Sequence, residues 1–275
     1  MADVPADPVP RSRFPLLRNR LKERLAAREL SLCLRVTMTA TTDLAFLARA
    51  AGFDALYVDM EHSTASASDA AALGATAAAL GVTPLVRVSS VDDDDAGRLL
   101  DAGCQGIIAP HVESAEQAGR LVERCLFPPL GRRSSYGPAR LLDYQDVPPA
   151  ELAEHLTSSA LLCVMLESEA AVSAADEIAA VPGIDLVLVG TQDLTAGLGI
   201  PGRVDDPAVV RMYEQVAAAT AAAGTAFGVA GVADPAVLAR YVELGAVFVS
   251  AGTDADLLRA AATARVEQLR ASLRS

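Results

Sequence analysis

The sequence predicts a single (β/α)8 barrel, a closed ring of parallel strands covered by helices. Eight short runs of almost continuously apolar residues are spaced along the chain, as is typical of parallel strands buried on both faces. Helical patterns lie between most of these runs, and 275 residues is a usual size for one such barrel. A doubly wound open sheet is the alternative, but the chain has neither of the glycine-rich phosphate loops common in that class.

The predicted strands are four to seven residues long and rich in Val, Leu, Ile and Ala. They are residues 32–36, 55–59, 84–88, 106–109, 161–167, 185–190, 226–230 and 246–250.

Five predicted helices show end signals such as a capping residue at the start or glycine at the end. They are residues 41–52, 66–81, 113–127, 206–224 and 234–245. The last two begin with Asp-Pro, an N-cap followed by proline at the first helical position. The connection 110–160 holds one of these helices and then the long segment 127–149, for which we expect a role over the site or at a subunit contact.

Composition narrows the class of protein. The formal net charge of −12 argues against nucleic acid and anionic membrane surfaces as partners. No apolar run approaches the roughly 18 residues of a membrane span, and the cysteines form no C-x-x-C pair. We therefore expect a cytoplasmic protein, with a flexible arm over residues 1–15 and a single barrel domain over 16–275.

Ionisable side chains gather where the predicted strands end, and catalytic groups of a barrel lie at the carboxyl ends of its strands. They are Asp59, Glu61, His62, Arg87, His111, Glu167 and Asp193. Such residues at five strand ends predict an active site on one face of the barrel.

The chemistry of this set favours a divalent cation. Glu167 and Asp193 offer oxygen ligands, which suit Mg²⁺ or Mn²⁺ better than zinc. A 2-oxo acid would chelate the cation, and Arg87 would stabilise the enolate oxygen. His62 is the natural proton shuttle, with Asp59 or Glu61 to orient it.

Two other mechanisms are disfavoured by residue counts. A Schiff-base aldolase needs a lysine inside the barrel, but Lys22 is the sole lysine and precedes the first strand. A three-histidine zinc site would need His62, His111 and His155 together, and His155 lies in the long connection.

From about residue 20 to 270, the chain resembles the HpcH/HpaI aldolases, metal-dependent class II pyruvate aldolases. The resemblance rests on "FDALYVDMEHS", "PLVRV", "LLDAGCQGIIAPHVESAEQA", "FPPLGRRS", "MLESEAAVSAADEIAAVPGIDLVLVGTQDLTAGLG" and "GAVFVSAGTDADLL". It implies a barrel of the phosphoenolpyruvate/pyruvate type whose last helix, about residues 255–273, is exchanged between subunits, usually within a hexamer or trimer of dimers.

The resemblance also implies roles for individual residues. His62 would be the catalytic base, with Asp59 as its dyad partner and Asp101 as a further acid nearby, across a subunit contact. Arg87 would bind the keto oxygen. Glu167 and Asp193 would bind Mg²⁺, Mn²⁺ or Co²⁺. The pyruvate carboxylate would be held by Gly190, Gln192 and Asp193.

The implied reaction is reversible cleavage of a 4-hydroxy-2-oxo acid to pyruvate and an aldehyde. The same site would also suit an oxaloacetate decarboxylase, a CoA-ester lyase or a citrate-synthase-like condensation, and a non-catalytic metal-binding barrel is a further alternative.

Two positions depart from the family pattern: Met165 replaces a common glutamine, and Thr191 replaces a common proline. For each of two further residues, the sequence leaves two roles open. His111 is structural or contacts substrate, and Arg133 pairs with an acid or binds the far carboxylate of an acidic aldehyde.

Overall fold

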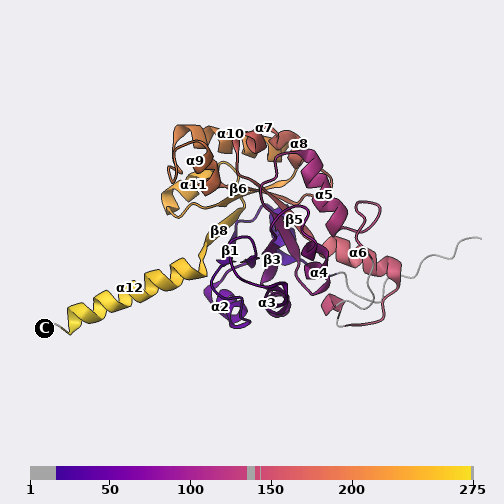
Figure 1. Cartoon of the computed structure of the whole chain (residues 1–275), viewed down its shortest axis with the longest axis horizontal. Helices are drawn as coiled ribbons and strands as arrows, with labels where there is room; N and C mark the ends of the chain where they lie inside the picture. Colours follow the sequence, from indigo (N-terminus) through magenta and orange to yellow (C-terminus); the bar gives the residue numbers. More distant parts are fainter. Residues whose placement is uncertain (1–16, 135–139, 143, 274–275) are drawn as a thin grey trace, which may run out of the picture.

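A computed structural model describes residues 17–134, 140–142 and 144–273, so the predicted arm over 1–15 lies outside the described residues. Eight parallel strands close into a barrel in sequence order, which confirms the predicted fold (Figure 1). The strands are β1 (Ser31–Val36), β2 (Ala55–Asp59), β3 (Thr83–Arg87), β4 (Gly106–Ala109), β5 (Leu161–Leu166), β6 (Leu186–Gly190), β7 (Ala226–Ala230) and β8 (Phe248–Thr253).

Helices surround the strands. The helices are α1 (Arg20–Ala26), α2 (Asp43–Ala51), α3 (Ala67–Leu80), α4 (Asp95–Asp101), α5 (Ala115–Cys125), α6 (Pro149–Ser159), α7 (Glu169–Ser173), α8 (Ala175–Ala179), α9 (Thr191–Gly197), α10 (Pro207–Ala223), α11 (Pro235–Glu243) and α12 (Asp254–Ser272), with a short 3₁₀ helix at Arg140–Leu142. The five helices whose ends were predicted all form. Within the described residues, none of the helices combines the length and hydropathy needed to span a membrane.

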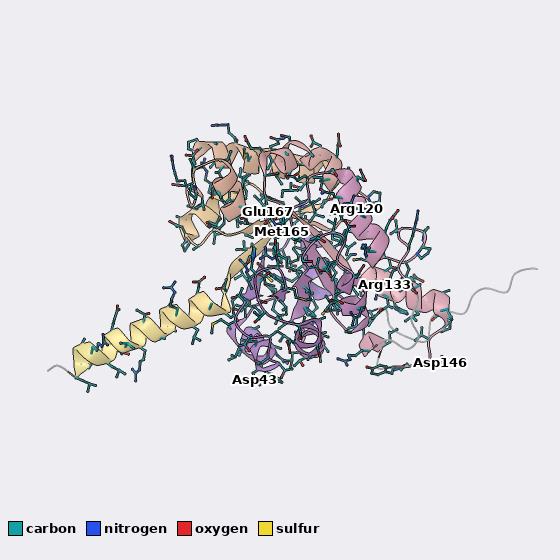
Figure 2. The ribbon with its side chains drawn as sticks, viewed as in Figure 1. Asp43, Arg120, Arg133, Asp146, Met165 and Glu167 are labelled. Carbon is teal, nitrogen blue, oxygen red and sulfur yellow. The ribbon has the colours of Figure 1, made fainter. Side chains whose placement is uncertain are left out.

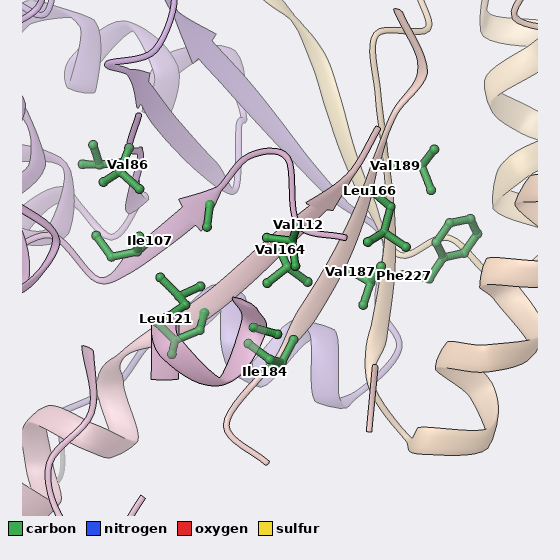
Figure 3. Close-up of a cluster of buried hydrophobic side chains, with 14 of the residues drawn as sticks. Val86, Ile107, Val112, Leu121, Val164, Leu166, Ile184, Val187, Val189 and Phe227 are labelled. Atoms are coloured by element: carbon green, nitrogen blue, oxygen red, sulfur yellow. The ribbon is translucent and has the colours of Figure 1, made fainter. Parts of the chain in front are cut away.

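Alternation along the strands divides the buried side chains into two sets. One set packs outward against the helices, and Figure 3 shows part of it, including Val86 of β3, Val164 of β5 and Phe227 of β7. The other set fills the barrel interior and includes Tyr57, Cys163 and Met165. This two-residue period decides which side chains of a strand can reach a site inside the barrel.

The amino end of the barrel is closed by α1, which the sequence did not predict. Leu21 and Leu25 are buried among the interior side chains. Asn19, the N-cap of α1, donates side-chain hydrogen bonds to the carbonyls of Gln105 and Ser159 at 2.8 and 2.7 Å. The carboxyl end is therefore the end left for a site.

The long connection between β4 and β5 contains a second helix, α6, which begins at Pro149. Phe127, Leu142 and Leu152 share a separate small apolar cluster there with Leu156. The connection is thus a packed extension of the helical layer over its described residues.

The last helix, α12, has no buried residue and extends away from the barrel (Figure 1). Its side chains include exposed Leu257, Leu258 and Leu269. Its N-cap is Thr253, whose hydroxyl accepts a hydrogen bond from the Asp256 N–H at 2.9 Å. The same residue ends β8, which runs three residues beyond its predicted end.

Candidate active site

The carboxyl-end layer of the barrel interior is made of charged groups and one glycine. Arg35, Asp59 and Arg87 occupy inward positions at the ends of β1, β2 and β3. Glu167 follows Met165 by two residues, so it points to the same side of β5, and Gly190 ends β6. Figure 2 shows Glu167 and Met165 together near the middle of the molecule. Strand alternation therefore delivers these groups to one place.

Asp59 is fully buried between two arginines. Arg87 donates to both of its carboxylate oxygens, from Nε at 3.0 Å and Nη2 at 2.6 Å. Arg35 donates to Oδ2 from Nε at 2.7 Å. Burial alone would raise the pKa of Asp59, but the bonds and charges of Arg87 and Arg35 outweigh it and lower the pKa to about 2. Asp59 is therefore a permanent anion that orients both guanidinium groups.

The imidazole of His62 is exposed and lies beside Glu61, with 3.8 Å between Nε2 and Glu61 Oε2. Asp59 contacts His62 through the backbone, since its Oδ1 accepts the His62 N–H at 3.1 Å. An Asp59–His62 dyad therefore stays a prediction. The two arginines engage the carboxylate of Asp59, and among the described residues Glu61 is the acid whose carboxylate lies beside the His62 ring.

Arg87 is almost completely buried, with 3% of the side chain exposed. Asp59 takes its Nε and Nη2 groups, which leaves Nη1 for other contacts. Nη1 lies 2.9 Å from Glu61 Oε2, without hydrogen-bond geometry, and 3.9 Å from the weakly accepting sulfur of Met165. This nitrogen is thus the part of Arg87 with donor capacity for a substrate oxygen.

Glu167 fits the predicted cation ligand. Its Oε2 accepts the His111 N–H at 2.8 Å, while its buried Oε1 has no hydrogen-bond partner among the described residues. Burial raises the pKa of Glu167, and the nearby charges of Asp193 and Glu61 act in the same direction. An unpaired carboxylate oxygen beside a second carboxylate is costly unless a cation neutralises it.

Gly190 makes room for that oxygen. A Cβ atom at this position would lie 2.6 Å from both the Cγ and the Oε1 of Glu167. Among the described residues, no group of three or more His, Cys, Asp or Glu side chains is arranged to hold a metal ion. Glu167 and Asp193 stay the predicted donor set, and two carboxylates suit hard divalent cations that keep water or substrate as further ligands.

The residues predicted to hold the pyruvate carboxylate lie at the start of α9, directly after β6. Gln192 and Asp193 are exposed, and the Gln192 amide donates to the Gly231 carbonyl at 2.5 Å. Thr191 is buried, and its hydroxyl contacts the Tyr213 hydroxyl and the Ala230 carbonyl, each at 2.6 Å. Thr191, which stands where the family commonly has proline, therefore places a hydroxyl with two hydrogen-bond contacts between β6 and α9.

His111 also reaches the site, directly after β4. Its Nε2 lies 2.8 Å from Glu61 Oε1, and its Nδ1 lies 3.0 Å from Glu167 Oε2. Both carboxylates are nearly buried, whereas 59% of the His111 side chain is exposed. Of its two predicted roles, the contacts show a ring that links two acids of the site.

Asp101 and Arg133 lie elsewhere in the chain. Asp101 ends α4, which returns the chain to the amino end of β4, and it accepts a 2.6 Å hydrogen bond from Arg133. Arg133 is buried, lies over the ring of Phe127 and is drawn far from Glu167 in Figure 2. Within one chain Asp101 is therefore not near His62, and a role across a subunit contact stays a prediction. Arg133 takes the structural role.

Sequence reasoning missed Arg35 and gave no firm role to Glu61 or His111. The signal for Arg35 was available, because it is two residues after inward-facing Cys33 and so belongs to the same face of β1. The contacts of His111 depend on a loop conformation that spacing does not reveal.

The fold is a closed eight-stranded parallel barrel, and a buried arginine, carboxylates and an exposed histidine lie at the carboxyl ends of its strands. The HpcH/HpaI aldolase/citrate lyase family matches residues 37–261. The chain belongs to this family, as the resemblance in the sequence indicated.

Relatives with known activities agree with that assignment. The 4-hydroxy-4-methyl-2-oxoglutarate aldolase of Chaetomium globosum is 37% identical over 216 residues, 78% of this chain and 80% of the relative. The hydroxypyruvate/pyruvate aldolase of Sagittula stellata is 34% identical over 194 residues, 70% of this chain and 76% of the relative. The chain is therefore a lyase of the aldolase class.

Solved structures give the same fold. An HpcH/HpaI aldolase from Desulfitobacterium hafniense superposes with a TM-score of 0.87 at 31% identity, covering 92% of this chain and 97% of that one. The citrate synthase SbnG superposes with a TM-score of 0.84 at 25% identity, covering 94% of this chain and 100% of that one.

Proposed function

We propose that the protein is a divalent-metal-dependent aldolase that cleaves and forms 4-hydroxy-2-oxo acids through a pyruvate enolate. The observation that carries this proposal is the unpaired, buried Oε1 of Glu167, which lies in the same layer as Arg87 and beside the negative charge of Asp193. The named activities of the relatives support the same chemistry. We propose Mg²⁺, Mn²⁺ or Co²⁺ as the metal, held by Glu167 and Asp193.

Different residues of the chain would bind the substrate, hold the cation and orient the groups that act in cleavage. A bound divalent cation supplies a Lewis acid that polarises the ketone of the 2-oxo acid and favours its enolate. Arg87 Nη1 donates to the keto oxygen, and Asp59 keeps the guanidinium in that orientation. Gly190, Gln192 and Asp193 border the space for the pyruvate carboxylate.

Proton transfer falls to His62, whose exposed ring can meet a substrate entering from solvent. In cleavage it accepts the C4 hydroxyl proton as the C3–C4 bond breaks. The electron pair of that bond passes to C3 and forms the enolate, and the carbonyl fragment departs as an aldehyde, or as a ketone where C4 carries no hydrogen. In condensation His62 returns the proton to the new alkoxide.

A citrate-synthase-like condensation is the second candidate, favoured by the superposition on SbnG. It would form the enolate of an acetyl thioester instead of pyruvate and add it to the keto carbon of a 2-oxo acid, with release of the thiol on hydrolysis. Oxaloacetate decarboxylation and CoA-ester cleavage are further uses of this site, and assays with each substrate separate them.

We also propose a homo-oligomer, a hexamer or a trimer of dimers, in which α12 packs on a neighbouring subunit. The exposed leucines of α12 support this, as does an apolar groove beside the start of α12 that is lined by Leu34, Leu44, Leu47 and Phe53.

Cytoplasmic location is proposed as well. It agrees with four buried thiols, of which burial raises the pKa of Cys104 and Cys125 to about 12.

The test is pyruvate release from 4-hydroxy-4-methyl-2-oxoglutarate, with and without EDTA and with each metal restored. Wild type should lose activity in EDTA and regain it with metal. Glu167→Gln and Asp193→Asn should stay inactive, whereas Glu169→Gln, an exposed acid two residues away, should behave as wild type. Metal-independent release, or full activity in both site variants, would refute the proposal.

A further inference from the structure

The loop after β4 carries an unusual backbone conformation at His111. Its φ is +54°, in the left-handed region that non-glycine residues seldom occupy. The next residue, Val112, donates its N–H to the Met165 carbonyl at 3.1 Å, and His111 itself donates to Glu167 Oε2 at 2.8 Å. The conformation therefore ties this loop to β5 on both sides of Leu166.

The ring of His111 is not held by packing. More than half of its side chain is exposed, so burial of apolar surface does not explain its place. Its two nitrogens contact acids from different strand ends, Glu61 at 2.8 Å and Glu167 at 3.0 Å. Glu61 in turn lies 2.9 Å from Arg87. A chain of contacts thus runs from the enolate-binding arginine to the metal-binding carboxylate.

Glu167 is held asymmetrically as a result. Oε2 receives both the backbone N–H and the ring contact from His111, while Oε1 is left without a partner in the space beside Gly190. Outer contacts that orient a ligating group are typically worth about 10–100-fold in metal affinity. The backbone hydrogen bond stays in any side-chain variant of His111, so such a variant tests the ring contact alone.

We infer that His111 is a positioning residue, which fixes Glu167 with Oε1 free for the metal and links it through Glu61 to Arg87. The inference rests on the proposed function, because it takes Glu167 as a metal ligand. It assigns the ring a role in metal affinity that is separate from proton transfer.

The test is Mn²⁺ binding to the full-length protein without substrate, measured as free Mn²⁺ by electron paramagnetic resonance. His111→Asn keeps a residue that tolerates positive φ and removes the ring contacts. It should weaken Mn²⁺ binding by about 10–100-fold at an unchanged melting temperature. His62→Asn removes an equally exposed ring that contacts Glu61 and should bind Mn²⁺ as wild type does.

Binding by His111→Asn within about twofold of wild type, while Glu167→Gln has lost it, would overturn this inference and leave the metal site standing. Unchanged binding in Glu167→Gln would instead refute the metal assignment itself. If His111→Asn does not fold, His111→Gly, which also tolerates positive φ, is measured and judged by the same two outcomes.

Discussion

Asp59 balances the charge of the site. It is fully buried, and both arginines of the carboxyl-end layer donate to it. Removing one partner of a buried ion pair is costly because the other charge stays uncompensated. Arg35 and Arg87 therefore depend on Asp59 for their place, which makes this aspartate structural as well as functional.

This pairing predicts a pH-dependent stability. The folded pKa of Asp59, about 2, lies below its ordinary 3.8. Its contribution is therefore complete above about pH 4 and is lost as pH falls toward about 2, and it amounts to about 2 kcal/mol. Asp59→Asn should lower the free energy of unfolding at neutral pH, with a deficit that narrows below about pH 4 in urea titrations. Asp176→Asn changes an exposed carboxylate and should leave the free energy of unfolding unchanged across this pH range. A deficit for Asp59→Asn that does not change with pH would contradict the pairing of Asp59 with the two arginines.

Gly190 gives a steric prediction about the metal. The Cβ of Gly190→Ala would meet Glu167 at 2.6 Å, so this carboxylate must move. We expect Mn²⁺ affinity to fall by about tenfold or more, as for other disturbed ligands. Gly197→Ala is the matched control, since nothing lies within 4 Å of its Cβ. Equal Mn²⁺ affinity in the two variants would show that Glu167 does not need this space.

At the scale of elements, the junction of β6, α9 and α10 depends on the buried hydroxyl of Thr191. Thr191→Val keeps the shape but leaves the Tyr213 hydroxyl and the Ala230 carbonyl without this partner. We expect a loss of about 1–3 kcal/mol in the free energy of unfolding. Thr76→Val, at a half-buried position of α3 where the hydroxyl bonds only to the Ala72 carbonyl, should cost less. Denaturant titration compares them, and equal costs would mean that the junction tolerates the loss.

The helix α12 supplies a prediction about assembly. Leu258 and Leu269 share one face of the helix, because eleven residues advance it by three turns plus about 20°. Aspartate at both positions should reduce the oligomer to smaller species in light scattering after size exclusion. Ala260→Asp introduces charge on the opposite face and should leave the assembly intact. An unchanged mass for the leucine double variant would remove α12 from the interface.

For the whole molecule, the sequence predicted the barrel because buried parallel strands give continuous apolar runs, such as "DLVLVG". It located Arg87, Glu167 and Asp193 because carboxyl ends of parallel strands meet at one face. Of the two carboxylates expected to orient His62, Glu61 lies beside its ring, whereas two arginines from other strands engage Asp59. Within one chain α4 carries Asp101 to the opposite end of the barrel, so its place near His62 stays a prediction for a subunit contact. Spacing in the sequence did not reveal contacts between distant segments, such as those of Asp59 with Arg35 and Arg87.

The proposed function requires this barrel to make a pyruvate enolate with a divalent metal. Exchange of the pyruvate methyl protons in D₂O, followed by proton NMR, tests it without an aldehyde. We predict exchange with Mg²⁺, Mn²⁺ or Co²⁺, none in EDTA, and a large loss in Glu167→Gln and His62→Ala. Absence of exchange with all of these metals, or undiminished exchange in EDTA, would contradict the account.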